Sequence, residues 1–220
     1  MGRDSLDALA AEAAALVDGT RRKVLGLAGP PAAGKSTLAR HLVAAVDARL
    51  GAGTAAYVPL DGFHLSDPQL VRIGRLDRKG APDTFDAWGY AALLGRLVAE
   101  PDHDVYVPDY DRVLHAPVAA RHVVPPAARL IVTEGNYLAA DAPEWRAARN
   151  RIDLLWYVET PDAERETRLV DRQRAGGKGE SAARDWVERS DRPNGEWVKP
   201  SQVHCDRSVV PPELPLESDK

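Results

Sequence analysis

A glycine-rich turn followed by lysine and serine, at residues 29–36, constrains this chain more than any other segment. Its spacing is G-x-x-x-x-G-K-S, with Lys35 and Ser36 at the end. The apolar run Lys23–Ala28 before it is typical of a buried strand, and Ser36–Leu50 after it is typical of a helix. A strand that leads through such a turn into a helix aims backbone N–H groups and the positive helix end at one point. The segment therefore predicts a polyphosphate site.

The residues of this turn have separable roles in holding a nucleotide. The N–H groups of Gly34 to Thr37 are expected to face the β-phosphate, the Lys35 ammonium to reach the β and γ oxygens, and the Ser36 hydroxyl to bind Mg²⁺. Lys35 is also expected to take part in catalysis. The nucleotide-binding residues expected in and next to the turn are Gly29, Ala33, Gly34, Lys35, Ser36 and Thr37.

Length and composition favour one α/β domain, because 220 residues bury a good core but leave little room for two domains. We expect this domain over residues 1–210, with an amphipathic helix within residues 1–20 and a flexible tail over 211–220.

The net charge of −4 predicts no nucleic-acid partner. Cys205 is the only cysteine, which excludes an intrachain disulfide and favours the cytoplasm. No apolar run approaches ~18 residues, so no membrane partner is expected.

Apolar runs and helical patterns alternate along the chain, which predicts a mostly parallel sheet covered on both faces. Thr160 is a candidate helix cap, with Pro161 at the first helical position. The further strands are expected at Ala55–Leu60, Val105–Val107, Leu130–Thr133, Leu154–Val158 and Gln202–Val210, and the further helices around Tyr90–Ala99, Pro143–Arg149, Asp162–Arg174 and Ala182–Arg189.

Two acidic residues, Asp61 and Glu134, directly follow apolar runs. Either one alone could be a helix cap or a turn former. Ligands of open α/β sheets collect at the carboxyl ends of strands, so two such acids beside a polyphosphate turn favour a functional site. Phosphoryl transfer needs one group to deprotonate the attacking hydroxyl and one to hold the metal or its waters. We assign Asp61 to the first role and Glu134 to the second, and we place Glu134 among the acceptor-facing residues as well.

A basic helix supplies the cations that a transferring phosphoryl group requires. Arg168 and Arg172 lie four residues apart on the pattern 162–174, and the glycine-rich segment 175–179 follows. The alternative is a solvated face paired with neighbouring acids. Because the polyphosphate turn needs a cationic partner, we expect a closing lid over about residues 162–192, with Arg168 and Arg172 as catalytic residues.

Two further groups of side chains are candidates for binding the acceptor. One lies in the long connection after Asp61, where no clear helix or strand is expected, and the other follows the run Val105–Val107. Either could instead be an ordinary charged surface. The acceptor-binding residues expected from the two groups are Arg75, Arg78, Lys79, Tyr110, Arg112 and His115.

With these residues in place, the chain resembles the P-loop kinase group of uridine kinase, pantothenate kinase and phosphoribulokinase. It is most similar to the bacterial branch described as nucleoside/nucleotide kinase-like or fructose-transport-kinase-like. The resemblance covers about residues 24–210. The motifs that carry it are residues 29–36, Asp61-Gly62-Phe63-His64, residues 78–86, Tyr110-Asp111-Arg112, residues 133–137 and Asp191-Arg192-Pro193-Asn194.

The resemblance implies a three-layer P-loop NTPase fold with a five-stranded parallel core, a helical lid, and the use of ATP with Mg²⁺. It implies that Asp61 is the catalytic base and that either Arg192 and Asn194 or the stretch Val203-His204-Cys205-Asp206 lies near the adenine. Tyr110 and His115 fall where uridine kinases hold the pyrimidine. Lys79-Gly80 stands where those enzymes have Phe-Asp, which favours a different small alcohol that carries a phosphate or a carboxylate.

The leading hypothesis is an ATP-dependent kinase that phosphorylates a hydroxyl of a nucleoside-, sugar- or pantothenate-like metabolite. A regulatory nucleotide switch is the alternative, although the guanine-selecting pattern N-K-x-D is absent. A nucleic-acid-directed ATPase is disfavoured by the acidic net charge. The oligomeric state stays open, and a homodimer is one of its options.

Overall fold

Five parallel strands form the central sheet of the computed structural model, which describes residues 2–19 and 21–214. Their order across the sheet is β2, β5, β1, β6, β7, and every neighbouring pair is parallel. The five-stranded parallel core expected from the sequence is confirmed. The strands span Lys23–Ala28 (β1), Ala55–Pro59 (β2), Leu130–Gly135 (β5), Leu154–Val158 (β6) and Arg207–Val209 (β7).

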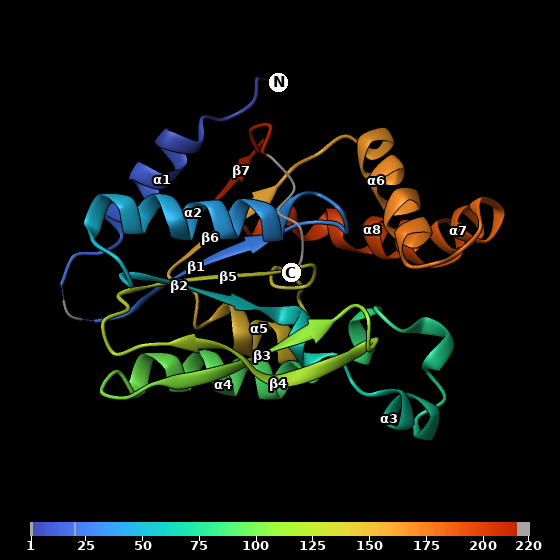
Figure 1. The fold of residues 1–220 in the computed structure, drawn as a ribbon, viewed down its shortest axis with the longest axis horizontal. Coiled ribbons are helices and arrows are strands. Elements are labelled where there is room, and N and C mark those ends of the chain that lie inside the picture. Colours follow the sequence, from blue (N-terminus) through green and yellow to red (C-terminus); the bar gives the residue numbers. More distant parts are fainter. Residues whose placement is uncertain (1, 20, 215–220) are drawn as a thin grey trace.

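Helices cover both faces of this sheet (Figure 1). α1 (Leu6–Ala15) and α2 (Lys35–Leu50) pack on one face, and α4 (Ala87–Ala99) and α5 (Pro143–Arg149) pack on the other. Side chains along β1 alternate between the two layers: Leu25 belongs to the core on the α1–α2 side, and Val24 to the core on the opposite side. Burial on both faces explains why such a strand is a continuous apolar run.

Three helices project from the sheet on the side where the strands end, and together they form the lid (Figure 1). They are α6 (Asp162–Ala175), α7 (Glu180–Trp186) and α8 (Arg192–Val198). A π-helical turn, Val187–Asp191, joins α7 to α8. Of the strand predicted over Gln202–Val210, only β7 forms, because the 3-10 segment Lys199–His204 occupies its first part. One proline, Pro200, and five polar side chains in 199–206 favour tight turns over a strand.

The strand predicted at Val105–Val107 forms, but outside the parallel sheet. β3 (Val105–Asp111) pairs with β4 (Ala116–Val124) in a separate antiparallel hairpin. The sequence analysis missed β4 because most of its residues are exposed or half-exposed, so it lacks the apolar run of a core strand. The connection 61–86, expected to lack regular structure, contains α3 (Asp67–Arg72) and three short 3-10 turns.

Gly62 allows the hairpin to lie directly on the turn that carries Asp61. A Cβ at Gly62 would lie 2.3 Å from the carbonyl oxygen of Pro108 in β3. Real Cβ atoms do not approach a carbonyl so closely, so only glycine fits at this position. The hairpin therefore forms one wall beside Asp61.

Arg22 fixes the opposite end of the sheet, although nothing in the sequence analysis singled it out. Its side chain is buried and donates to four backbone carbonyls. Those carbonyls belong to Leu97, Glu100, Pro125 and Ala128, at the end of α4 and in the turn before β5. A buried guanidinium is tolerated because its donors are satisfied in this way.

The start of the predicted tail packs on the domain. Pro211 is buried and its carbonyl accepts a hydrogen bond from Arg3, while Leu214 packs against the core on the α1–α2 side. The rest of the predicted tail, 215–220, lies outside the described residues. Among the residues that are described, no helix has the length and apolarity needed to cross a bilayer.

Replacing Gly62 with alanine should destabilise the protein, because the new Cβ must push the β3 backbone away from the Asp61 turn. We expect a loss of about 1–3 kcal/mol in the free energy of unfolding, as for other overpacked sites. Thermal and urea denaturation monitored by circular dichroism would measure it.

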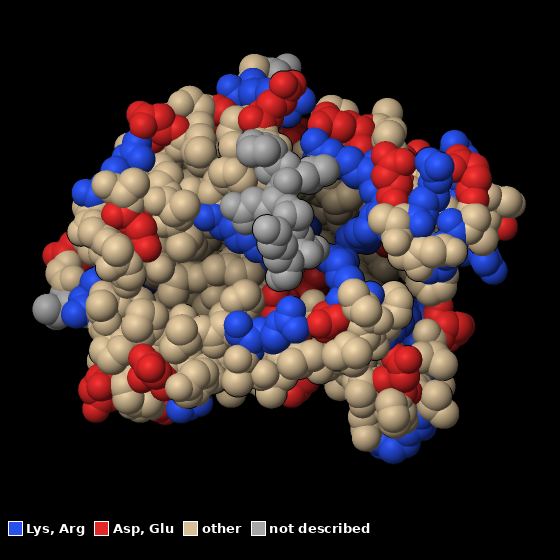
Figure 2. Space-filling model, viewed as in Figure 1, with Lys and Arg blue, Asp and Glu red and all other residues tan. Residues whose placement is uncertain are grey.

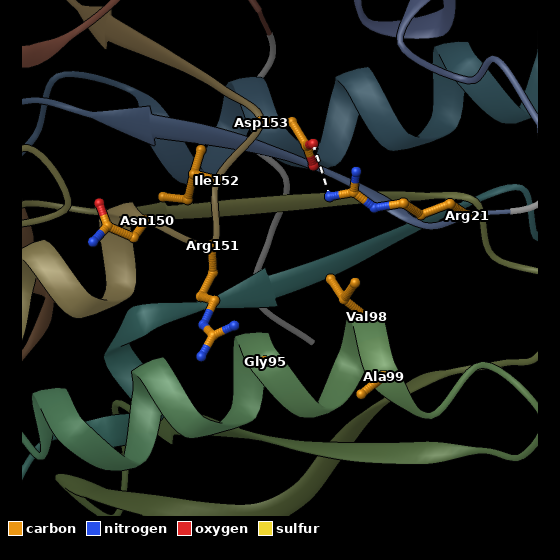
Figure 3. A pocket seen from close by; sticks show the side chains of 8 residues that line it. All are labelled: Arg21, Gly95, Val98, Ala99, Asn150, Arg151, Ile152 and Asp153. Carbon is orange, nitrogen blue, oxygen red and sulfur yellow. Dashed lines mark hydrogen bonds and ion pairs between the residues drawn. The ribbon is translucent and has the colours of Figure 1, made fainter.

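Gly95 in α4 offers the matched control (Figure 3). A Cβ there would meet only the Arg151 guanidinium, at 3.6–3.8 Å, which is ordinary contact. Gly95→Ala should raise the stability by about 0.5–1 kcal/mol through helix propensity. Equal stabilities of the two variants would contradict the close packing of the hairpin.

Candidate active site

The glycine-rich turn, the P-loop, runs from the end of β1 into α2 as predicted. Gly34 is the N-cap of α2 with φ of 90°, and Ala32 also has a positive φ, of 60°. Gly29 packs against the end of β6, where a Cβ would be 2.6 Å from the Val158 carbonyl oxygen. Backbone in alternating conformations of this kind forms a concave nest of N–H groups at the start of a helix. The geometry fits a polyphosphate.

Four successive carbonyls of the P-loop, those of residues 30–33, accept hydrogen bonds from side chains. Contacts of this kind fix the backbone of the turn that leads to the N–H groups of Gly34 to Thr37. The donors are Lys35 Nζ to Pro30 (2.9 Å), Arg165 Nη1 to Pro31 (3.1 Å), Arg168 Nη1 to Ala32 (3.2 Å) and Thr160 Oγ1 to Ala33 (2.9 Å). We call these four contacts the carbonyl clamp.

Lys35, the first residue of α2, is buried. Besides Pro30, its ammonium donates to Asn136 Oδ1 at 2.7 Å. Burial lowers the pKa of Lys35 to about 8, and the charges of Glu134 and Asp61 act in the opposite direction. Both acids therefore lie within electrostatic reach of the lysine, which is the arrangement that the sequence predicted.

Glu134 is a buried carboxylate at the end of β5. Its Oε1 accepts hydrogen bonds from Ser36 Oγ at 3.0 Å and from the Tyr57 hydroxyl at 2.9 Å. Burial, followed by the charge of Asp61, raises the pKa of Glu134. The Ser36 hydroxyl and the Glu134 carboxylate place oxygen ligands of the type that Mg²⁺ prefers beside the P-loop. The two predicted metal residues are thus in contact.

Asp61 lies in the 3-10 turn Leu60–Phe63, directly after β2. Its carboxylate is one-third exposed, and Oδ2 lies 3.8 Å from Arg112 Nη2 of the hairpin. Because β2 and β5 are neighbours in a parallel sheet, Asp61 and Glu134 emerge at the same edge. The structure therefore brings the predicted base, the predicted metal residue and the P-loop lysine to one cleft.

The lid directs three arginines of α6 toward this cleft. Arg165 is almost fully buried; besides Pro31 it binds Asp162 at 2.6 Å, and its Nε has no hydrogen-bond partner in the described part of the chain. Arg168 also pairs with Glu164. Arg172 lies 3.5 Å from Asp191, and its charge reaches Lys35. Figure 2 shows lysine and arginine side chains gathered around the hollow between the lid and the sheet.

The predicted acceptor residues divide into two groups. Tyr110 and Arg112 line the wall near Asp61, and the Tyr110 ring packs on His64 with centroids 4.8 Å apart. Lys79 instead links the connection to the hairpin turn, because its ammonium binds Asp67 and the carbonyl of His115, each at 2.6 Å. His115 is exposed at the hairpin turn and contributes this carbonyl.

Three other predicted residues lie apart from the centre. Arg75 and Arg78 both pair with Asp83 on the surface of the connection. Arg192 pairs with Glu166 and Glu188, so its guanidinium faces acids of the lid rather than the P-loop. Asn194 is half-buried beside Gly195, where the Arg165 guanidinium packs. The contact of Arg192 or Asn194 with adenine stays a prediction.

Sequence reasoning missed several residues that shape the site. Thr160 was expected to cap α6, but the N-cap is Pro161, and the Thr160 hydroxyl binds the P-loop instead. Thr160 follows β6 as Asp61 follows β2, so the same carboxyl-end rule could have singled it out. Tyr57 and Asn136 lie within or beside the quoted motifs, but only the folded chain shows their contacts with Glu134 and Lys35.

The hollow drawn in Figure 3 is a different place. Its volume is about 220 Å³, and it is lined by residues that precede β1 and β6, with part of α4. These positions lie at the amino ends of the strands, opposite the P-loop. It therefore does not belong to the candidate active site.

Known proteins resemble the chain over nearly its whole length, although no protein-family model matches it. A Schizosaccharomyces pombe protein named "Putative uridine kinase C227.14" is 31% identical over 222 residues, covering 98% of this chain and 94% of that protein. The pantothenate kinase of Paenarthrobacter aurescens is 28% identical over 204 residues, covering 86% of this chain and 63% of that enzyme.

Among solved structures, a "putative fructose transport system kinase" from Silicibacter sp. TM1040 is similar with a TM-score of 0.84 and 34% identity, covering 93% of this chain and 98% of that one. All three of these proteins are named as kinases, and the first and the third match this chain over almost their whole length. The chain is therefore a small-molecule kinase and belongs to the P-loop kinase group that includes uridine kinase and pantothenate kinase.

Proposed function

We propose that this kinase transfers the terminal phosphoryl group of ATP to a hydroxyl of a small, anionic metabolite, with Asp61 as the general base. The observation that carries the proposal is the position of Asp61 directly after β2, at the sheet edge where β5 carries Glu134, from which its charge acts on the pKa of both Lys35 and Glu134. A base must lie within reach of both the acceptor hydroxyl and the phosphate site, and this position supports that role.

In the proposed reaction, the acceptor oxygen forms a bond with the γ-phosphorus as the bond from phosphorus to the ADP oxygen breaks. Asp61 accepts the proton of the acceptor hydroxyl. The P-loop N–H groups and Lys35 hold the phosphates, and the lid arginines Arg168 and Arg172 face the negative charge of the transferring group. Because the carbonyl clamp fixes the backbone of the P-loop, the groups that hold the phosphates need little reorganisation during transfer.

Mg²⁺ fits the donor set on the P-loop side. Ser36 and Glu134 would hold the ion or its waters, because both present oxygen atoms and Mg²⁺ binds through one or two carboxylates plus substrate phosphates. When bound, the ion neutralises charge on the β and γ oxygens. In the described part of the chain, no three His, Cys, Asp or Glu side chains form a cage, and this mode of binding needs none.

Arg112 supports an acceptor that carries a phosphate or a carboxylate. Its guanidinium lies 3.8 Å from the Asp61 carboxylate on the hairpin wall, so an acceptor whose hydroxyl reaches Asp61 would meet this cation next to it. Lys79, which the sequence suggested for this purpose, is already engaged with Asp67 and His115. A planar guanidinium is also well suited to carboxylates and phosphates.

Formation of ADP in the presence of a panel of alcohols tests this function. The panel contains neutral nucleosides and sugars beside matched alcohols that carry a carboxylate or a phosphate. We expect ADP formation to require an acceptor and to favour an anionic one. Slow hydrolysis that ignores every alcohol would support a nucleotide switch instead, and a preference for neutral alcohols would overturn the anionic class.

Asp61→Asn should abolish transfer while leaving ATP binding intact, because the amide keeps the shape of the side chain but cannot accept the proton. We expect kcat to fall by ~10²–10⁴-fold, the usual worth of a general base. Steady-state kinetics and calorimetric titration with ATP would separate the two effects.

Asp77→Asn provides the control, because Asp77 is an exposed aspartate in the same connection. It should behave as the unmodified protein. Full activity of Asp61→Asn would remove Asp61 from the mechanism.

A further inference from the structure

Asp191 is a buried acid at the base of the lid, and the proposed reaction does not use it directly. It is the last residue of the π-helical turn Val187–Asp191, and only 8% of its surface is exposed. Its Oδ1 lies 3.5 Å from Arg172 Nη2, and its Oδ2 lies 3.4 Å from Gln173 Nε2. π-helical turns inside helices are often found at functional sites, where they reorient a side chain.

A chain of polar contacts holds Asp191 within the lid. Gln173, which donates to Asp191, accepts a hydrogen bond from Lys178 Nζ at 2.8 Å. The Lys178 ammonium in turn lies 4.9 Å from the centre of the Trp186 ring. These contacts connect α6, the glycine-rich segment, α7 and the π-helical turn. The Asp191 carboxylate is therefore fixed by parts of the lid that lie well away from the P-loop.

Arg172 is the group through which Asp191 can influence the reaction. Its side chain is 40% exposed, so the contact with Asp191 covers only part of it. Burial lowers the pKa of Arg172, the charge of Asp191 raises it, and the charges of Arg112 and Asp61 also reach it. Arg172 thus lies between a fixed lid carboxylate and the proposed base.

Energetics favour a role for this acid beyond stability. A buried carboxylate carries a desolvation cost, and burial accordingly raises the pKa of Asp191. An apolar residue in its place would often give equal or greater stability. An arginine side chain, in contrast, samples many rotamers unless a partner restricts it. The clear effect of Asp191 is to restrict Arg172.

We propose that Asp191 is a positioning residue, which holds the Arg172 guanidinium against the transferring phosphoryl group. This inference rests on the proposed function, because it assigns Asp191 a role only if Arg172 acts during transfer. Asp191 itself touches neither the nucleotide nor the acceptor. Its effect should therefore fall on kcat and vanish when Arg172 is absent.

A double-mutant cycle tests the inference on the full chain, with Asp191→Asn, Arg172→Gln and the pair. We expect Arg172→Gln to lower kcat by ~10³-fold, as for other phosphoryl-transfer arginines. Asp191→Asn should lower kcat by ~10–100-fold with the KM for ATP changed less than about threefold, as for other outer supporting residues. In the Arg172→Gln background, Asp191→Asn should change kcat by less than about twofold.

Two further variants keep the result interpretable. Asp171→Asn removes an exposed acid next to Arg172 that pairs with Arg174, and it should leave kcat unchanged. Asp191→Glu keeps the charge and should recover part of the lost kcat. Thermal melting of every variant separates loss of fold from loss of positioning.

Each outcome has a defined meaning. An unchanged kcat for Asp191→Asn, equal factors in the two backgrounds, or an effect confined to the KM for ATP would overturn the inference. Normal kcat in Arg172→Gln would overturn both the inference and the proposed role of Arg172. A strong effect of Arg172→Gln without coupling to Asp191 would leave the proposed function standing and remove Asp191 alone.

Discussion

The carbonyl clamp on the P-loop is the contact on which the rest of the site depends. Four neighbouring carbonyls, of residues 30–33, are held by side chains from α2, from α6 and from the segment after β6. The N–H groups that follow this segment, those of Gly34 to Thr37, can then converge on one point at the start of α2. Two of the clamp donors are lid arginines of α6. The position of α6 is therefore coupled to the backbone geometry of the P-loop.

The topology of the sheet explains why the reactive groups meet. β2, β5 and β6 run parallel, so residues at or just after their carboxyl ends emerge at one edge: Asp61, Glu134 and Thr160. The hairpin closes this edge from the side, and Gly62 sets how close it can come. The lid helices α6 and α7 lie beyond the strand ends, on the right of Figure 1. A long irregular connection contributes Lys79, which ties the hairpin turn to α3.

Local sequence signals predicted the parts of this arrangement that depend on local chemistry. The strand, turn and helix around Lys35, the acids after β2 and β5, and the basic face of α6 all follow from spacing, and the structure brings Asp61, Glu134 and Arg172 toward one lysine. Partner choice could not be predicted, because it depends on contacts between distant segments. Thus Thr160 binds the P-loop instead of capping α6, and Lys79 pairs with Asp67.

The same limit applies to structure that leaves weak local signals. β4 is mostly exposed and packs through its partner strand, so its sequence has no core periodicity. Asp191 lies next to Arg192 in the sequence, yet the π-helical turn buries the first, and the second faces Glu166 and Glu188. A one-residue difference in helical register therefore decides which of the two side chains contacts Arg172.

The affinity of Thr160→Val for ATP, measured calorimetrically, tests the central claim about the clamp most directly. The substitution keeps the shape of the side chain but removes the donor to Ala33, which leaves a carbonyl of the P-loop unpaired and the loop less fixed. The looser loop must be ordered when ATP binds; an ordering cost of about 1.4 kcal/mol would give the roughly tenfold weaker binding that the account predicts. Unchanged affinity in a variant that melts at the same temperature would contradict it.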